Sequence, residues 1–283
     1  ECKICTHLNG IYEDSEAFNK KIYLDQKEIS YSKNYHQKNL KDYSFRKNQI
    51  YKPKSIFLKK YFKRKKINLS KIQILDIGAG SGYFMSSLID QGFKNLTGIE
   101  LNKKQVDFGK AMLIKQKKYA KLIHVDYKNV FEYANLTKSN CITLIGVIEH
   151  LREPRRLFEI ISANKNIKYL YFSVPIYSLS CLFESIFPNV FNRHLGGSHT
   201  HLFTEKSLKN FLGKFNFHTE EEWWFGLDFL DLYRSFYYEA GNKGNGALNK
   251  KLNEFKKIID DLQIVIDKNK LSSEVHMICK KRS

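Results

Sequence analysis

The stretch "LDIGAGSGYF", residues 75–84, leads from an apolar run to an acidic residue and then places a glycine at every second position. The run "KIQILDI" (71–77) is short and apolar, as expected of a buried strand. Glycine accepts positive φ angles and lets a ligand approach the backbone closely. We therefore expect Gly78, Gly80 and Gly82 to form a ligand-binding turn between this strand and a following helix.

Apolar runs and helical patterns alternate after this turn. Strands are predicted at "LTGIEL" (96–101), "AKLIHVD" (120–126), "CITLIGVI" (141–148) and "IKYLYFSVP" (167–175), and helices at 82–92, 103–118 and 153–165. Strands and helices that alternate at this spacing build a parallel sheet with helices on both faces. The predicted fold class is α/β, a Rossmann-like doubly wound and mostly parallel sheet.

The alternation ends after Pro175, and Pro53 interrupts the helical pattern that precedes the first strand. The remaining predictions are a helix from about Lys54 with a shorter one before it, a helix over 204–215 capped by Thr204, a partly helical aromatic segment over 221–241, an amphipathic helix over 249–270 and a strand over 273–281.

The 283 residues are enough for one large domain with additions. We expect residues 1–40 to be the remnant of an N-terminal module with a linker, and residues 41–70 to be a helical lead-in. Residues 71–283 then form the ligand-binding domain, with insertions at about 176–203 and 221–270 that cover the substrate. Because the chain begins with Glu rather than Met, we expect a longer reading frame.

The net charge of +19 is compatible with nucleic-acid binding. However, only 8 of the 48 basic residues are Arg, and the Lys residues are spread along the whole chain. The densest basic stretch, "LKKYFKRKKINLSK" (58–71), suits a solvated helix face better than a site for an acidic partner. No apolar run approaches the roughly 20 residues of a membrane span.

Cysteine usage points to a reducing compartment. Cys141, Cys181 and Cys279 lie in apolar contexts or in a predicted strand, so we expect buried thiols and a cytoplasmic protein.

The N-terminal pair Cys2 and Cys5, in "CKIC", has metal-ligand spacing but supplies only half of a tetrahedral zinc site. Three alternatives remain open. A second cysteine pair lies upstream in a longer form of the chain, or His7 and His36 complete the site, or the pair binds no metal.

The spacing of the glycines narrows the choice of ligand. A dinucleotide-binding turn reads GxGxxG, whereas this turn reads GxGxG and has Tyr83 at the place of the third glycine. No GK[ST] run follows, so a phosphate-binding loop is also disfavoured.

Four motifs in order, "LDIGAGSG", "GIELN", "HVD" and "IGVIEHL", resemble those of the class I S-adenosylmethionine-dependent methyltransferases over about residues 70–220. The resemblance implies that the glycine loop holds the methionine part of the cofactor, that Glu100 binds both ribose hydroxyls and that Asp126 lies near the adenine. A carboxylate suits the ribose, because it can accept two hydroxyl bonds at once. The implied cofactor-binding residues are Asp76, Gly78, Ala79, Gly80, Gly82, Tyr83, Glu100, Leu101, Asp126 and Tyr127.

The run "EHLREP" (149–154) places Glu149 and His150 at the same carboxyl edge of the sheet. Methyl transfer to a hydroxyl or a carbon acid requires removal of a proton, and His is suited to that task near neutral pH. The Glu-His pair resembles a subgroup that includes sugar C-methyltransferases and quinone O-methyltransferases, in which this histidine is a proposed base or metal ligand. The quinone enzymes carry a further acid where this chain has Gly146, which argues against a metal site. We expect His150 to be the base; the alternative is that it only orders its loop.

Three further histidines, His194, His199 and His201, lie in "NRHLGGSHTHLF" (192–203). No neighbouring Cys or acid completes a metal site, so substrate contact and loop hydrogen bonds are favoured. His199 and His201 are candidates for a second base.

The predicted function is methyl transfer to a small-molecule acceptor, such as a sugar precursor of a surface polysaccharide or natural product. "CKIC" adds to the resemblance, because sugar C-methyltransferases carry a small zinc module before the cofactor domain. A nucleic-acid methyltransferase is the first alternative, but no [DN]PP[YF] run follows the fourth strand and no Pro-Cys nucleophile occurs. A non-catalytic partner subunit would not need Glu100 and the glycine loop, and Tyr83 disfavours a nicotinamide dehydrogenase.

Overall fold

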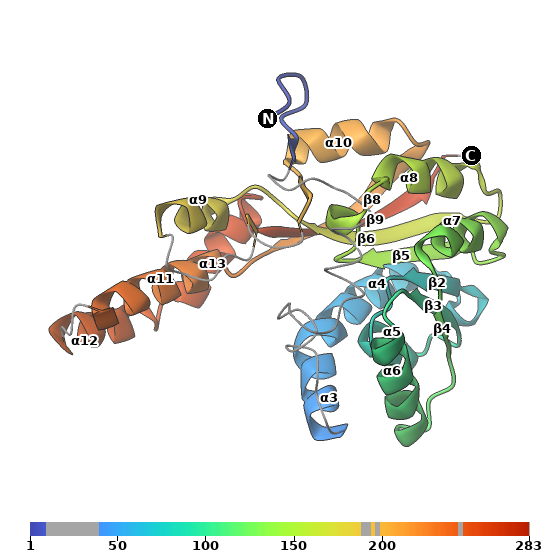
Figure 1. Ribbon diagram of the computed structural model, residues 1–283, viewed down its shortest axis with the longest axis horizontal. Helices are drawn as coiled ribbons and strands as arrows, with labels where there is room; N and C mark the ends of the chain where they lie inside the picture. The colour runs from blue at the N-terminus through green and yellow to red at the C-terminus, as the bar shows by residue number, and fades with distance from the viewer. Residues whose placement is uncertain (10–39, 188–193, 196–198, 243–245, 283) are drawn as a thin grey trace.

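The computed structural model describes residues 1–9, 40–187, 194–195, 199–242 and 246–282. A seven-stranded sheet of order β4-β3-β2-β5-β6-β9-β8 forms its centre (Figure 1). Strands β2 to β6 are parallel, whereas β9 runs antiparallel to both β6 and β8. Their bounds are β2 Gln73–Ile77, β3 Asn95–Glu100, β4 Lys121–His124, β5 Cys141–Ile145, β6 Tyr169–Pro175, β8 Phe217–Phe225 and β9 Glu274–Lys281. The α/β fold class predicted from the sequence is confirmed.

Helices cover both faces of the sheet (Figure 1). One face carries α4 (Lys52–Arg64), α5 (Tyr83–Asp90) and α6 (Lys103–Lys115), and the other carries α7 (Tyr127–Leu136), α8 (Pro154–Ala163) and α10 (Glu205–Gly213). The apolar side chains accordingly form two main cores, one around Leu58 and Phe84 and the other around Phe158 and Leu208. Because the central strands are buried on both faces, they read as continuous apolar runs in the sequence.

The N-terminal helical segment is more continuous than expected. Helix α3 (Leu40–Arg46) passes through a π-helical turn (Lys47–Tyr51) directly into α4. Pro53 lies in the first turn of α4, directly after the π-helical turn; because it lacks an N–H, it cannot extend regular α-helical bonding from the preceding turn. The proline therefore begins a helix, as predicted, without a break in the chain path.

Four helices form an arm that projects from the sheet (Figure 1). They are α9 (Leu179–Ile186), α11 (Asp228–Asn242), α12 (Gly246–Phe255) and α13 (Ile259–Lys268). The prediction of one helix over 249–270 is wrong, because i→i+3 hydrogen bonds from Lys257 to Glu254 and from Ile258 to Phe255 end α12 before α13 begins. No helix among the described residues is long and apolar enough to cross a membrane.

Short elements lie in the loops at both edges of the sheet. A 3-10 turn (Leu69–Lys71) precedes β2, and another (Ile148–His150) follows β5. The two-residue strand β1 (Leu8–Asn9) pairs antiparallel with β7 (His201–Leu202). Thr204 caps α10 through a capping box, as predicted.

The expectations for Cys141, Cys181 and Cys279 are confirmed, since all three are buried free thiols. His36 and most of the predicted linker lie outside the described residues, as do residues 188–193 and 196–198 of the first insertion.

Candidate functional site

The glycine turn connects β2 to α5 in a left-handed conformation. Gly78, Gly80 and Gly82 have φ angles of 73°, 53° and 69°. The N–H groups of Gly78 and Ala79 both donate to the carbonyl of Ile99, which ties the turn to the end of β3. A Cβ atom at position 78 would lie only 2.6 Å from Cγ2 of Val147. The chain itself therefore requires glycine at position 78, before any ligand is considered.

Gly78→Ala should lower the free energy of unfolding by about 2–5 kcal/mol, because the left-handed conformation costs about 1–2 kcal/mol and overpacking against Val147 about 1–3 kcal/mol. Urea unfolding measures the change. Gly213→Ala is the matched control, since nothing lies within 4 Å of its added Cβ. If both variants were equally stable, the steric explanation for Gly78 would be refuted.

Glu100 ends β3 and faces the turn. Its Oε2 accepts a hydrogen bond from the Gly80 N–H at 2.9 Å, and its Oε1 accepts one from the Asn102 N–H at 2.9 Å. Burial raises the pKa of Glu100, while these amides act in the opposite direction. Each carboxylate oxygen can accept a further hydrogen bond. The side chain is thus held in one orientation and suits a pair of ligand hydroxyls.

Asp76 lies at the end of β2 and is 3% exposed. Its Oδ1 accepts a hydrogen bond from the Thr143 hydroxyl at 2.5 Å. Burial raises the pKa of Asp76 to about 7, against the effect of the Thr143 bond. The carboxyl group therefore changes its charge near neutral pH in the folded protein.

The raised pKa of Asp76 predicts a loss of stability with rising pH. Between the ordinary pKa of an Asp and about 7, the folded protein retains a proton that the unfolded chain has released, so unfolding becomes easier as pH rises. Between pH 5 and pH 8 we expect Asp76→Asn to lose about 2 kcal/mol less unfolding free energy than the wild type. Urea unfolding at both pH values tests this, with the exposed Asp107→Asn as control. Equal losses in wild type and Asp76→Asn would contradict it.

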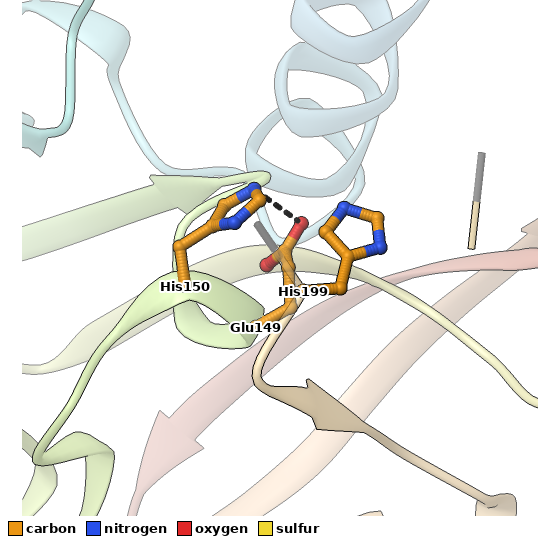
Figure 2. A group of neighbouring side chains, drawn as sticks. All are labelled: Glu149, His150 and His199. Carbon is orange, nitrogen blue, oxygen red and sulfur yellow. Dashed lines mark ion pairs between the residues drawn. The ribbon is translucent and has the colours of Figure 1, made fainter. Parts of the chain in front are cut away.

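Glu149, His150 and His199 form one cluster at the carboxyl edge of β5 (Figure 2). The carboxylate of Glu149 lies between the two imidazole rings. Glu149 Oε1 is 3.8 Å from His150 Nε2, and the ring centroids of His150 and His199 are 4.8 Å apart. The structure thus brings together three of the four residues predicted to be catalytic, although His199 is separated from the other two in the sequence.

The cluster has unusual electrostatics. Glu149 is 3% exposed, and its Oε2 has no hydrogen-bond partner among the described residues. Burial raises the pKa of Glu149 to about 8. His199 Nδ1 lies 3.2 Å from the carbonyl oxygen of His194, so this nitrogen carries the hydrogen and the neutral ring has its lone pair on Nε2.

One carboxylate and two imidazoles are also a donor set for a divalent cation. Within the described ranges this is the one group of three or more His, Cys, Asp or Glu side chains whose donor atoms, within 4.8 Å of one another, could hold a metal ion. Cys2 and Cys5 gain no third ligand from the described residues. Hydrogen bonds from the backbone N–H groups of Cys5 and Ile4 lower the pKa of Cys2. The half zinc site at these cysteines stays a prediction.

A single cavity of about 1090 Å³ joins the glycine turn, Glu100 and the cluster. Of the predicted cofactor-binding and catalytic residues, Gly82 and His201 are absent from its lining. None of the described residues between 221 and 270 lines the cavity, so the role of this insertion as a cover for the acceptor stays a prediction. The predicted site residues that line the cavity are Asp76, Gly78, Ala79, Gly80, Tyr83, Glu100, Leu101, Asp126, Tyr127, Glu149, His150 and His199.

Sequence reasoning missed an ion pair in the cavity wall. Lys54 Nζ lies 3.2 Å from Glu274 Oε1, and the same oxygen is 3.0 Å from His276 Nε2. Burial raises the pKa of Glu274, but Lys54 and His276 outweigh it and hold the pKa well below its usual range. Lys54 lies in α4 and Glu274 begins β9, so no motif within one segment of the sequence predicts the pair.

Comparison with known proteins gives a family and a fold. Residues 45–222 match the family described as "Methyltransferase domain". The sequence has no match among curated proteins.

Three solved structures share the fold at low sequence identity. An S-adenosylmethionine-dependent methyltransferase from Clostridium acetobutylicum ATCC 824 has a TM-score of 0.54 and 12% identity, over 90% of this chain and 100% of that one. The plantazolicin methyltransferase BpumL, in complex with a monoazolic desmethylPZN analog and SAH, has a TM-score of 0.53 and 17% identity, over 94% and 97%. Magnesium protoporphyrin IX methyltransferase from Synechocystis PCC 6803 with bound SAH has a TM-score of 0.52 and 12% identity, over 82% and 83%.

Proposed function

The chain belongs to the S-adenosylmethionine-dependent methyltransferases, and on this premise we propose that it methylates a small-molecule acceptor bound at the Glu149 end of the cavity. The observation that carries the proposal is the continuity of the cavity, which joins Glu100 to the Glu149–His150–His199 cluster. A ligand at the first group and an acceptor at the second would therefore share one cavity.

The cofactor end fits S-adenosylmethionine. Glu100 would accept hydrogen bonds from both ribose hydroxyls, because its two oxygens are oriented by the Gly80 and Asn102 amides. The left-handed turn at Gly78 and Gly80 would leave room for the methionine part. When bound, the cofactor supplies an electrophilic methyl group. We propose Asp126 and Tyr127 as the residues beside the adenine, since both line the same cavity.

The acceptor end supplies a base. In this proposal a His150 ring nitrogen takes the proton from an acceptor hydroxyl or acidic carbon as the methyl group is transferred. In its carboxylate form Glu149, whose Oε1 lies 3.8 Å from His150 Nε2, stabilises the resulting imidazolium. His199 packs against His150 and completes this wall.

The polar wall favours an acceptor that carries several hydroxyl groups, such as an activated sugar. Glu149 and the Lys54–Glu274 pair supply acceptors and donors for hydroxyls. The rings of Tyr51 and Tyr83, stacked with centroids 5.4 Å apart, supply an apolar surface in the same cavity. Cavities with a few placed polar groups on an apolar lining are typical of small-molecule sites.

Calorimetric titration with S-adenosylhomocysteine, beside NAD, tests the cofactor. Release of S-adenosylhomocysteine from S-adenosylmethionine then tests acceptors in parallel: nucleotide sugars, quinols and a structured RNA. Turnover with a nucleotide sugar supports the proposal in full, and turnover with quinols alone supports only the small-molecule class. Turnover with RNA alone overturns that class, and failure to bind S-adenosylhomocysteine overturns the cofactor assignment.

A further inference from the structure

The first nine residues contact the segment that follows His199. Strand β1 pairs with β7, so that Leu8 lies opposite Leu202 and Asn9 opposite His201. The hydroxyls of Thr6 and Thr204 lie 2.6 Å apart, and the His7 ring packs against Phe203 with centroids 4.9 Å apart. In Figure 1 the N-terminus accordingly lies beside the start of α10, although the two are far apart in the sequence. We call residues 1–9 the N-terminal clasp.

A chain of two hydrogen bonds leads from the clasp to the loop that carries His150. His201 Nε2 lies 3.1 Å from the carbonyl oxygen of Leu151. A carbonyl only accepts, so the hydrogen is on Nε2 and the neutral His201 ring accepts at Nδ1. His7 Nε2 lies 3.2 Å from that Nδ1 and must therefore donate. His7 thereby selects the tautomer of His201 that can bond Leu151.

Hydrogen bonds from Thr200 hold Glu149, the residue that precedes His150. Both the N–H and the hydroxyl of Thr200 donate to the carbonyl of Glu149, at 3.0 Å and 3.2 Å. The carbonyl groups on either side of His150, those of Glu149 and Leu151, are thus both bonded to the segment 200–201. That segment directly follows His199, so one stretch of chain sets the positions of both imidazoles of the cluster.

We propose that His7 is a positioning residue for methyl transfer. It acts through His201 and Leu151 to fix the positions of the His150 and His199 rings relative to each other. The inference rests on the proposed function, because it takes the cluster as the acceptor end of the site. It gives the N-terminal segment a catalytic purpose that requires no metal at Cys2 and Cys5. Its essential element is the donor on His7, not the bulk of the ring.

Two variants separate the donor from the ring. His7→Phe keeps a ring against Phe203 and removes the donor, whereas His7→Gln keeps an N–H donor. His218→Gln, at a half-buried residue of β8 outside the cavity lining, is the control. The readout is the set of histidine ring signals in an NMR spectrum of selectively labelled protein, which has nine His residues. Spectra of His150→Ala and His199→Ala assign the two relevant signals.

In His7→Phe we expect the His150 and His199 signals to shift while the affinity for S-adenosylhomocysteine stays unchanged. His7→Gln and His218→Gln should resemble the wild type in both signals. With the acceptor found above, kcat of His7→Phe should fall about 10- to 100-fold at unchanged KM for S-adenosylmethionine, as expected for a misplaced catalytic group. Unchanged His150 and His199 signals in His7→Phe would overturn the inference, as would equal shifts in His7→Phe and His7→Gln. If the wild type failed to bind S-adenosylhomocysteine, the proposed function would be overturned. The NMR comparison of His7→Phe with the wild type does not depend on that outcome, because it needs no cofactor.

Discussion

Glu100→Ala should weaken the binding of S-adenosylhomocysteine by about 100-fold or more. The variant removes the acceptor proposed for two ligand hydroxyls, and hydrogen bonds to a charged group are worth about 1.5–3 kcal/mol each. It also leaves the N–H groups of Gly80 and Asn102 without their present acceptor, so that only the bonds of Gly78 and Ala79 to Ile99 still tie the turn to the end of β3. Calorimetric titration of both proteins measures the change.

The matched control for Glu100 is Asp107→Ala, an exposed acid on the neighbouring helix α6. That variant should bind S-adenosylhomocysteine like the wild type. Urea unfolding shows whether Glu100→Ala keeps the fold. A folded Glu100→Ala protein with wild-type affinity would contradict the role of Glu100, and binding of NAD instead of S-adenosylhomocysteine by the wild type would contradict the choice of cofactor.

His150→Ala should lower turnover by about 10²–10⁴-fold, the usual contribution of a positioned general base. The affinity for S-adenosylhomocysteine should stay within about twofold, because the contacts proposed for the cofactor are made by Glu100 and the glycine turn and not by His150. Initial rates of S-adenosylhomocysteine release, with the acceptor found in the panel, measure the effect.

His218→Ala serves as the control for His150, since His218 lies in β8 and is absent from the cavity lining. It should retain wild-type turnover. If His150→Ala turned over at the wild-type rate as well, His150 would not be the base. The cluster would then contribute to acceptor binding, seen as a raised KM for the acceptor.

Several basic side chains form ion pairs within the fold, which weakens the argument from net charge to a nucleic-acid partner. Lys47 and Lys118 both pair with Asp90, and Lys54 pairs with Glu274. In the densest basic stretch, Arg64 and Lys65 pair with Glu221 and Glu220 of β8, so part of that stretch holds α4 against the sheet edge. Net charge by itself is therefore a weak guide to the partner of this protein.

The sequence alone determined the fold class and the placement of the glycine turn and Glu100 at one edge of the sheet. Within residues 71–175, the spacing of apolar residues along the chain is enough to recognise the strands and helices. This spacing can be read without knowing the tertiary structure. The glycine turn and Glu100 follow from the same logic, because both lie at the ends of adjacent parallel strands. The prediction of one helix over 249–270 failed because hydrogen bonds of a turn replace the α-helical ones between α12 and α13.

Only the tertiary structure decided which side chains meet in the Glu149–His150–His199 cluster. His199 reaches His150 through a segment inserted after β6, and Lys54 meets Glu274 across the sheet. His7 and His201 are 194 positions apart, yet their rings share a hydrogen bond, and His201 also bonds the carbonyl of Leu151. Contacts of this kind arise when distant segments pack together to bury apolar surface and to pair their polar groups. No spacing along the chain encodes them, so the partners of these histidines emerge only in the folded protein.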